Sequence, residues 1–108
     1  MISTKLGLKK DCPRIVCFYA NYSGSCHLMH PMIEDLKDDY GKDIEVVLVE
    51  KGKNKDLELQ YDIKEFPTIL ILCVNDELIR LNGLVNRDEL YRHINYSLNR
   101  FSEMDQPN

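Results

Sequence analysis

Three short apolar runs dominate the pattern of hydrophobic and polar positions along the chain. They are "RIVCFYA" (14–20), "IEVVLV" (44–49) and "TILILCV" (68–74), and each is rich in β-branched or aromatic residues. Runs of this length and composition predict buried strands. "ELIRLN" follows the third run after Asn75 and Asp76, so the two segments are predicted to form an antiparallel hairpin with a polar turn.

The segment from Cys26 to Tyr40 has a different pattern, because its apolar residues recur every three or four positions. This spacing predicts a helix with one buried face, and Gly41 is a plausible stop signal for it. Pro31 lies inside the segment, which predicts a kink or a lost hydrogen bond.

Two more helices follow from weaker patterns. "DLELQYDI" (56–63) suggests a short helix, although alternation along a strand fits it equally well. A terminal helix is predicted to start at Asn86, because Glu89 three residues later resembles a capping box. Its buried face would be lined by Leu90, Ile94, Leu98 and Phe101. The polar segment 102–108 is expected to be a flexible tail.

The order of these elements is strand, helix, strand, helix, hairpin and helix. It predicts an α/β fold in which a mixed central sheet, with a parallel central pair and an antiparallel edge, has helices on both faces. A chain of 108 residues is long enough for one domain with a single core, and a second domain would be unusual at this length. We therefore expect one domain over 1–108, with its core at about 12–98.

Charge and hydropathy narrow the range of partners. The net charge of −4 and the isoelectric point near 5.3 argue against a nucleic-acid partner, because no basic patch is present. No apolar run is as long as a membrane span, and "MISTKLGLKK" lacks the apolar region of a secretory signal. We expect a cytoplasmic monomer with no membrane or nucleic-acid partner.

Cysteines and histidines are the candidates for redox or metal chemistry. The cysteines match neither a zinc site nor a dense disulfide framework, so most should be reduced thiols. They are Cys12, Cys17, Cys26 and Cys73. "CHLMH" offers Cys26, His27 and His30 as ligands, but a structural zinc site normally needs four, so we expect no metal and no cofactor. Cys12 is expected in an exposed loop, and the facing of Cys73 is undetermined.

Four motifs in these positions together resemble the thioredoxin family. "FYANYSGSC" (18–26) stands in place of the family's F-x-A-x-W-C-G-P-C, and His30-Pro31 matches the proline of the active-site helix. "FPT" (66–68) and Gly83 match the substrate groove. The resemblance implies a thioredoxin-like fold in which Pro67 is cis and faces the active-site loop. Only eleven residues precede Cys12, so the family's N-terminal helix is expected to be shortened or absent.

The resemblance also assigns the catalytic positions, which are Ser23 and Cys26. Dithiol exchange needs an attacking thiolate and a second thiol that resolves the mixed disulfide. The hydroxyl of Ser23 is scarcely ionised at neutral pH and forms no disulfide, so dithiol reductase activity should be absent or impaired. The family's buried acid and its lysine partner are matched by Cys17 and Leu48. Cys17 is thus a candidate position for proton relay or for pairing with Cys26, although it carries a thiol in place of the family's carboxylate.

Two questions about the thiols stay open in the sequence. Cys26 is either a buried, inert thiol or a reactive single thiol near a helix start that favours a thiolate. Cys17 could lie beneath it, so the two could form a disulfide if their geometry allows. The sequence also does not show whether Ser23 is the natural residue or a replacement for cysteine.

These features give two main functional hypotheses. The first is a thioredoxin-like thiol–disulfide redox protein in cell redox homeostasis, with an incomplete active site. It would act on disulfide-containing segments and use a thioredoxin reductase-like electron donor. The alternative is a non-catalytic module that binds extended peptides in a shallow groove. The groove would be formed by Tyr22, Gly24, Ser25, Phe66, Pro67 and Gly83. A monothiol mechanism with glutathione at Cys26 is a weaker third option.

Overall fold

One mixed sheet organises the part of the chain that the structure describes. The computed structural model describes residues 13–73 and 76–105. Its strands lie in the order β2–β1–β3–β4, where β1 and β2 are parallel and the β1–β3 and β3–β4 pairs are antiparallel. Their bounds are β1 (Arg14–Tyr19), β2 (Glu45–Glu50), β3 (Thr68–Cys73) and β4 (Asp76–Asn82). The predicted hairpin is confirmed, and residues 74–75 of its turn lie outside the described residues.

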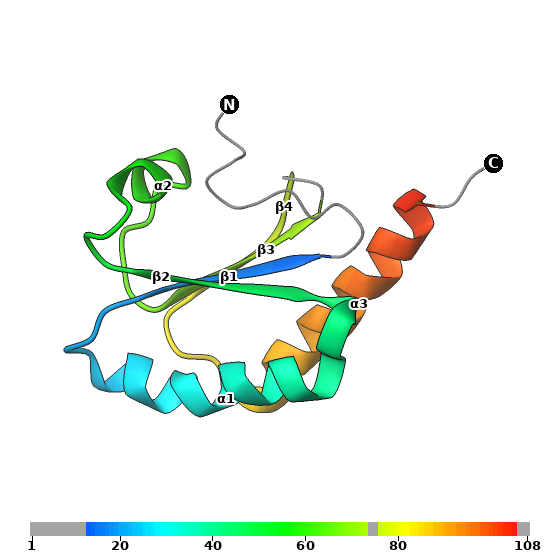
Figure 1. The fold of residues 1–108 in the computed structure, drawn as a ribbon, viewed down its shortest axis with the longest axis horizontal. Helices are drawn as coiled ribbons and strands as arrows, with labels where there is room; N and C mark the ends of the chain where they lie inside the picture. Colours follow the sequence, from blue (N-terminus) through cyan, green and yellow to red (C-terminus); the bar gives the residue numbers. More distant parts are fainter. Residues whose placement is uncertain (1–12, 74–75, 106–108) are drawn as a thin grey trace.

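Helices cover both faces of this sheet (Figure 1). α2 (Lys55–Gln60) lies on one face, whereas α1 (Gly24–Tyr40) and α3 (Arg87–Asp105) lie on the other. A short 3-10 turn, η2 (Gly41–Asp43), follows α1. This arrangement confirms the predicted α/β fold with a mixed sheet between helices. The predicted parallel central pair was wrong, because the parallel pair β1–β2 includes an edge strand and the central pair β1–β3 is antiparallel. The expectations for the N-terminal helix and for Cys12 fall outside the described residues.

Burial follows the position of each strand in the sheet. Every side chain of β3 is buried, because β3 lies between two neighbouring strands and helices cover both of its faces. Along β1, Ile15 and Cys17 belong to the core on the side of α1 and α3, and Val16 and Phe18 belong to the core on the side of α2. None of the described helices combines the length and apolar character needed to cross a membrane.

β2 differs from the predicted strand 44–49 in its range and its burial. It spans Glu45–Glu50 and lies at the edge of the sheet, where Val49 is its only buried residue. Leu48 is 37% exposed. The prediction of a buried strand was wrong here, because an unbroken apolar run does not distinguish a central strand from an edge strand with one covered face.

α1 begins two residues earlier than the predicted start at Cys26. Its N-cap is Ser23, so Gly24 and Ser25 belong to the first helical turn rather than to a loop. The buried residues of this helix, Cys26, Met29, Ile33 and Leu36, recur at the predicted spacing. The helix continues through Pro31 and ends at Gly41, whose positive φ of 52° is a conformation that glycine adopts readily.

Asparagine side chains start the other two helices. Asn54 Oδ1 accepts a hydrogen bond from Leu57 N–H at 3.2 Å, which fixes α2 as a helix and excludes the strand alternative. Asn86 Oδ1 accepts from Glu89 N–H at 2.8 Å and confirms the predicted start of α3. α3 runs through Asp105, so residues 102–105 of the predicted tail are helical. The sequence of α3 contains no glycine or proline from Arg87 to Asp105, so no residue of this kind ends the helix at position 102.

Candidate functional site

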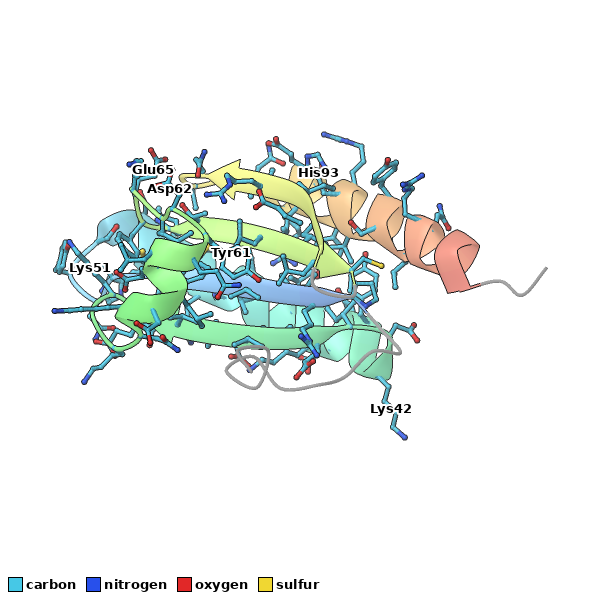
Figure 2. The ribbon with its side chains drawn as sticks, turned by 90° about the horizontal axis from the view of Figure 1, so that it is seen from above. Lys42, Lys51, Tyr61, Asp62, Glu65 and His93 are labelled. Carbon is cyan, nitrogen blue, oxygen red and sulfur yellow. The ribbon has the colours of Figure 1, made fainter. Side chains whose placement is uncertain are left out.

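Strand direction brings the candidate site residues to one end of the sheet. β1 and β2 are parallel and both end there, so the turn into α1 and the turn after β2 are neighbours. β3 runs antiparallel to β1 and begins there, and β4 ends there. Figure 2 shows Lys51 at this end and Lys42 at the opposite end. The topology therefore gathers segments that are far apart in the sequence.

Ser23 caps the helix that carries Cys26. Its backbone is extended, with φ −91° and ψ 127°, and its Oγ accepts a hydrogen bond from Cys26 N–H at 3.3 Å. Serine is one of the preferred N-cap residues because its side chain satisfies a backbone donor that has no partner inside the helix. The half-buried hydroxyl thus has a structural role, and it lies at the position where the resemblance places the attacking thiol.

Cys26 lies directly beneath this cap. Its side chain is 5% exposed, and its Sγ accepts a hydrogen bond from Ala20 N–H at 3.3 Å. This hydrogen bond holds the sulfur against the end of β1, below the first turn of the helix. The small exposed fraction restricts its access to a protein disulfide.

Cys17 is a fully buried neutral thiol. Burial raises its pKa from 9.0 to about 12, and the nearby Cys26 adds a smaller contribution in the same direction. Its Sγ donates to Met29 Sδ at 3.8 Å. Leu48, which pairs with Cys17 across the sheet, supplies no charge that would lower this pKa. Neither residue can replace the proton relay that the resemblance implies for these positions.

No disulfide joins Cys17 to Cys26. Both are free thiols. Cys73, whose facing the sequence left undetermined, is buried. The structure thus contains no Cys17–Cys26 disulfide, the pairing that the sequence left open. Sequence spacing placed the two residues on adjacent elements, but the pairing depends on the separation and direction of their Cβ atoms.

The two histidines near Cys26 contact other groups. His27 Nε2 lies 2.8 Å from the carbonyl oxygen of Asn21, and His30 Nε2 lies 3.9 Å from Glu34 Oε2. Within residues 13–73 and 76–105, no three histidine, cysteine or acidic residues are placed to hold a metal ion. A shallow pocket of about 280 Å³ opens beside the thiol. It is lined by Tyr19, Ala20, Asn21, Cys26, His27 and His30.

The loop before β3 is fixed against the end of β4. The Phe66–Pro67 peptide bond is cis, as the resemblance implied, and Gly83 N–H donates to the Pro67 carbonyl at 2.7 Å. Gly83 has a φ of 84°, and a Cβ atom there would lie 3.3 Å from Glu65 Oε2. Glycine suits this position because it tolerates positive φ and leaves room for Glu65. Phe66 and Gly83 are half-buried and Pro67 is buried, so Phe66 and Gly83 are the parts of this connected region that reach the surface.

Lys51 connects this surface to the turn before α1, and the sequence analysis did not single it out. Its Nζ donates to Tyr22 Oη at 2.6 Å and lies 5.3 Å from the ring centroids of both Tyr22 and Phe66. Such distances allow cation–π attraction to both rings. Lys51 begins the charged segment 51–55, which closely follows the predicted strand 44–49, so a charged turn at this end of the sheet was the signal that could have identified it.

Gly24 and Ser25 lie in the first turn of α1, close in sequence to Tyr22. A Cβ atom on Gly24 would meet nothing within 4 Å, so the surface above this turn is open. Tyr22 is 75% exposed, and Phe66 is half-buried. The candidate groove residues thus include an exposed helix turn and aromatic side chains from two loops.

Replacing Ser23 should measure its role as a cap. Ser23→Ala is expected to lower the free energy of unfolding by about 1 kcal/mol, because Cys26 N–H loses its acceptor. Ser23→Asp should retain most of the stability, since aspartate also accepts this bond. The measurement is urea unfolding followed by circular dichroism. Ser25→Ala is the control, with an expected change below about 0.5 kcal/mol. Equal losses for Ser23→Ala and Ser25→Ala would contradict the cap.

The buried thiol of Cys17 should make stability depend on alkaline pH. Because its pKa in the folded protein is raised, its contribution is complete below the unfolded value of 9.0 and is lost as pH rises toward about 12. Above pH 9 the unfolded chain releases this proton first, so alkali favours unfolding. The free energy of unfolding of the native chain should fall more steeply between pH 9 and pH 11 than that of Cys17→Ala. Parallel pH profiles would show that Cys17 does not cause the effect.

Comparisons with known proteins agree with this geometry. The family model described as Thioredoxin matches residues 5–96. Thioredoxin from Rickettsia bellii is 25% identical over 91 residues, which cover 84% of this chain and 87% of that protein. Thioredoxin 1 from Nostoc sp. is 29% identical over 83 residues, covering 77% of this chain and 78% of that protein.

Solved structures show the same likeness. Thioredoxin-2 of a malaria parasite, described as a component of that parasite's protein secretion machinery, superposes with a TM-score of 0.77 at 26% identity. That match covers 82% of this chain and 86% of the other. Fasciola hepatica thioredoxin shares the fold, with a TM-score of 0.75 at 24% identity over 82% and 83% of the two chains. Since the family model spans most of the sequence, the chain belongs to the thioredoxin family of redox proteins.

Proposed function

We propose that this chain is a thiol–disulfide redox protein in which Ser23 occupies the position of the attacking cysteine, so that it lacks dithiol reductase activity in this form. The observation that carries the proposal is the hydrogen bond from Cys26 N–H to Ser23 Oγ. The hydroxyl is engaged as a helix cap, and it is scarcely ionised at neutral pH. A dithiol cycle would need a thiolate at this position.

Cys26 alone supports at most half of such a cycle. Its thiolate could attack a disulfide R–S–S–R′ to form Cys26–S–S–R and release R′–S⁻. Completing the cycle requires a second thiol, and the nearest protein thiol, Cys17, is buried and stays protonated at neutral pH. The mixed disulfide would therefore persist until an external thiol, such as glutathione, reduced it. The low exposure of Cys26 makes even this first step slow with large substrates.

A peptide-binding module without catalysis is the second candidate, and the loop geometry favours it. The loop with Phe66 and Pro67 is joined to Gly83 by a backbone hydrogen bond and does not depend on a thiol at position 23. Lys51 links the exposed Tyr22 to this loop, because its ammonium hydrogen-bonds the Tyr22 hydroxyl and lies near the Phe66 ring. An extended segment could lie along this surface and use its backbone groups for affinity. The partners proposed are extended or disulfide-containing segments of proteins in the cytoplasm.

Restoring the thiol separates the two candidates. The native chain should reduce insulin disulfides with dithiothreitol no faster than dithiothreitol alone, whereas Ser23→Cys should increase the rate, because two thiols then lie one helical turn apart. The gain should be at least about tenfold, since it replaces an unreactive hydroxyl with a potential thiolate. Turbidity from the precipitating insulin chains gives the rate. A thioredoxin reductase-like donor becomes a relevant partner only for this variant.

The matched control is the double variant Ser23→Cys with Cys26→Ser, which should lose turnover because no second thiol resolves the mixed disulfide. Turnover by the native chain above that of Cys26→Ser would contradict the proposed inactivity. A folded Ser23→Cys variant without any gain would end the redox proposal and favour the binding module. We also expect Ser23→Cys to be slower than a typical thioredoxin, since Cys17 and Leu48 supply no buried acid or lysine.

A further inference from the structure

Lys51 places a fixed positive charge at the edge of the proposed groove. Its backbone N–H donates to the Tyr19 carbonyl at 2.7 Å, which holds the residue against the end of β1. Its ammonium lies 5.3 Å from the ring centroids of Tyr22 and Phe66, which come from two different loops. Two aromatic contacts and the hydrogen bond to Tyr22 restrict a side chain that is otherwise among the most flexible.

This ammonium keeps donors for a ligand. A lysine ammonium has three hydrogens to donate, and one is directed at Tyr22 Oη. Lys51 is exposed, and within the part of the chain that the structure describes no carboxylate lies within 4.0 Å of its Nζ. Its partner in the structure is thus a neutral hydroxyl rather than an acid.

The nearby acidic side chains have other hydrogen-bond donors. Glu50 Oε2 accepts from Asn21 Nδ2 at 2.6 Å, and Glu58 Oε2 accepts from Gly52 N–H at 2.7 Å. The charge of Glu58 still acts on Lys51 through space, and Glu65 lies beside Gly83. These charges weaken the positive potential without occupying the remaining donors of Lys51.

We propose that Lys51 makes the groove selective for peptide segments that carry an aspartate or glutamate beside the residues lying along Phe66 and Pro67. This inference depends on the proposed groove and goes further by naming the chemistry of its occupant. The chain has a net charge of −4, which would repel acidic segments at long range. At physiological ionic strength charges act over about 8 Å, so the local cation at the groove outweighs distant acids.

The ion pair would be stronger than a typical surface pair. Exposed pairs lose affinity because both side chains must be ordered when they meet. Lys51 is already ordered by Tyr22 and Phe66, so binding costs less conformational entropy.

Paired peptides test this selectivity with the native chain. The probes are blocked octapeptides of alternating valine and serine, in which one glutamate or one glutamine is moved through the four central positions. Amide shifts of ¹⁵N-labelled protein give the dissociation constants. At one position or more, the glutamate peptide should bind about threefold to tenfold tighter than its glutamine counterpart, the range expected for a single pre-ordered ion pair.

Lys51→Met should remove this preference, so that the glutamate peptides bind no tighter than their glutamine counterparts, because methionine keeps an unbranched stem and loses the charge. Lys53→Met is the matched control, since Lys53 is an exposed lysine of the same turn, and it should retain the preference. Equal urea unfolding of the two variants verifies that both are folded.

Three outcomes would contradict the proposal, and they separate the role of Lys51 from the existence of the groove. Equal affinity for glutamate and glutamine peptides, with shifts at Phe66 and Gly83, would overturn the role of Lys51 and leave the groove intact. A preference that persists in Lys51→Met would assign the selectivity to another cation and also overturn it. An absence of shifts at Phe66 and Gly83 with every peptide would overturn the groove itself, and this inference with it.

Discussion

The burial of β1 and β3 between two layers of helices is the constraint on which the site depends. Both strands are covered on both faces, so their apolar runs fix the order and direction of the sheet. With those directions fixed, the turn before α1, the turn after β2 and the cis-proline loop must meet at one end. The candidate groove is thus a consequence of core packing, and a change at position 23 does not remove it.

Ser23 serves the structure as a helix cap, and under the proposed function it lacks the chemistry of an attacking thiol. An N-cap needs a side-chain oxygen that accepts a backbone hydrogen bond, and serine provides it at the start of α1. Thiol exchange at the same position needs an ionisable sulfur, which serine lacks. In the core, the thiol of Cys17 packs against Met29, and its raised pKa keeps it protonated at neutral pH.

Much of the fold could be predicted from the sequence, because β3 and the buried face of α1 have clear periodicity and the motifs resemble a known family. The start of α1 was placed too late, since Gly24 and Ser25 contribute no apolar side chain to the helical pattern and the capping role of Ser23 depends on backbone geometry. The edge position of β2 and the free thiols of Cys17 and Cys26 depend on tertiary contacts that spacing does not encode. Lys51 was missed for the same reason, because its aromatic partners are distant in sequence.

The central claim is that the native chain keeps a peptide groove at the end of the sheet but does not exchange disulfides with what it binds. The most direct measurement adds a blocked peptide with one intramolecular disulfide to ¹⁵N-labelled native protein, recording amide shifts and free thiols in the same sample. We expect amide shifts at Tyr22, Phe66 and Gly83 without release of peptide thiols. Release of peptide thiols by the native chain, or shifts confined to residues away from this end of the sheet, would contradict it.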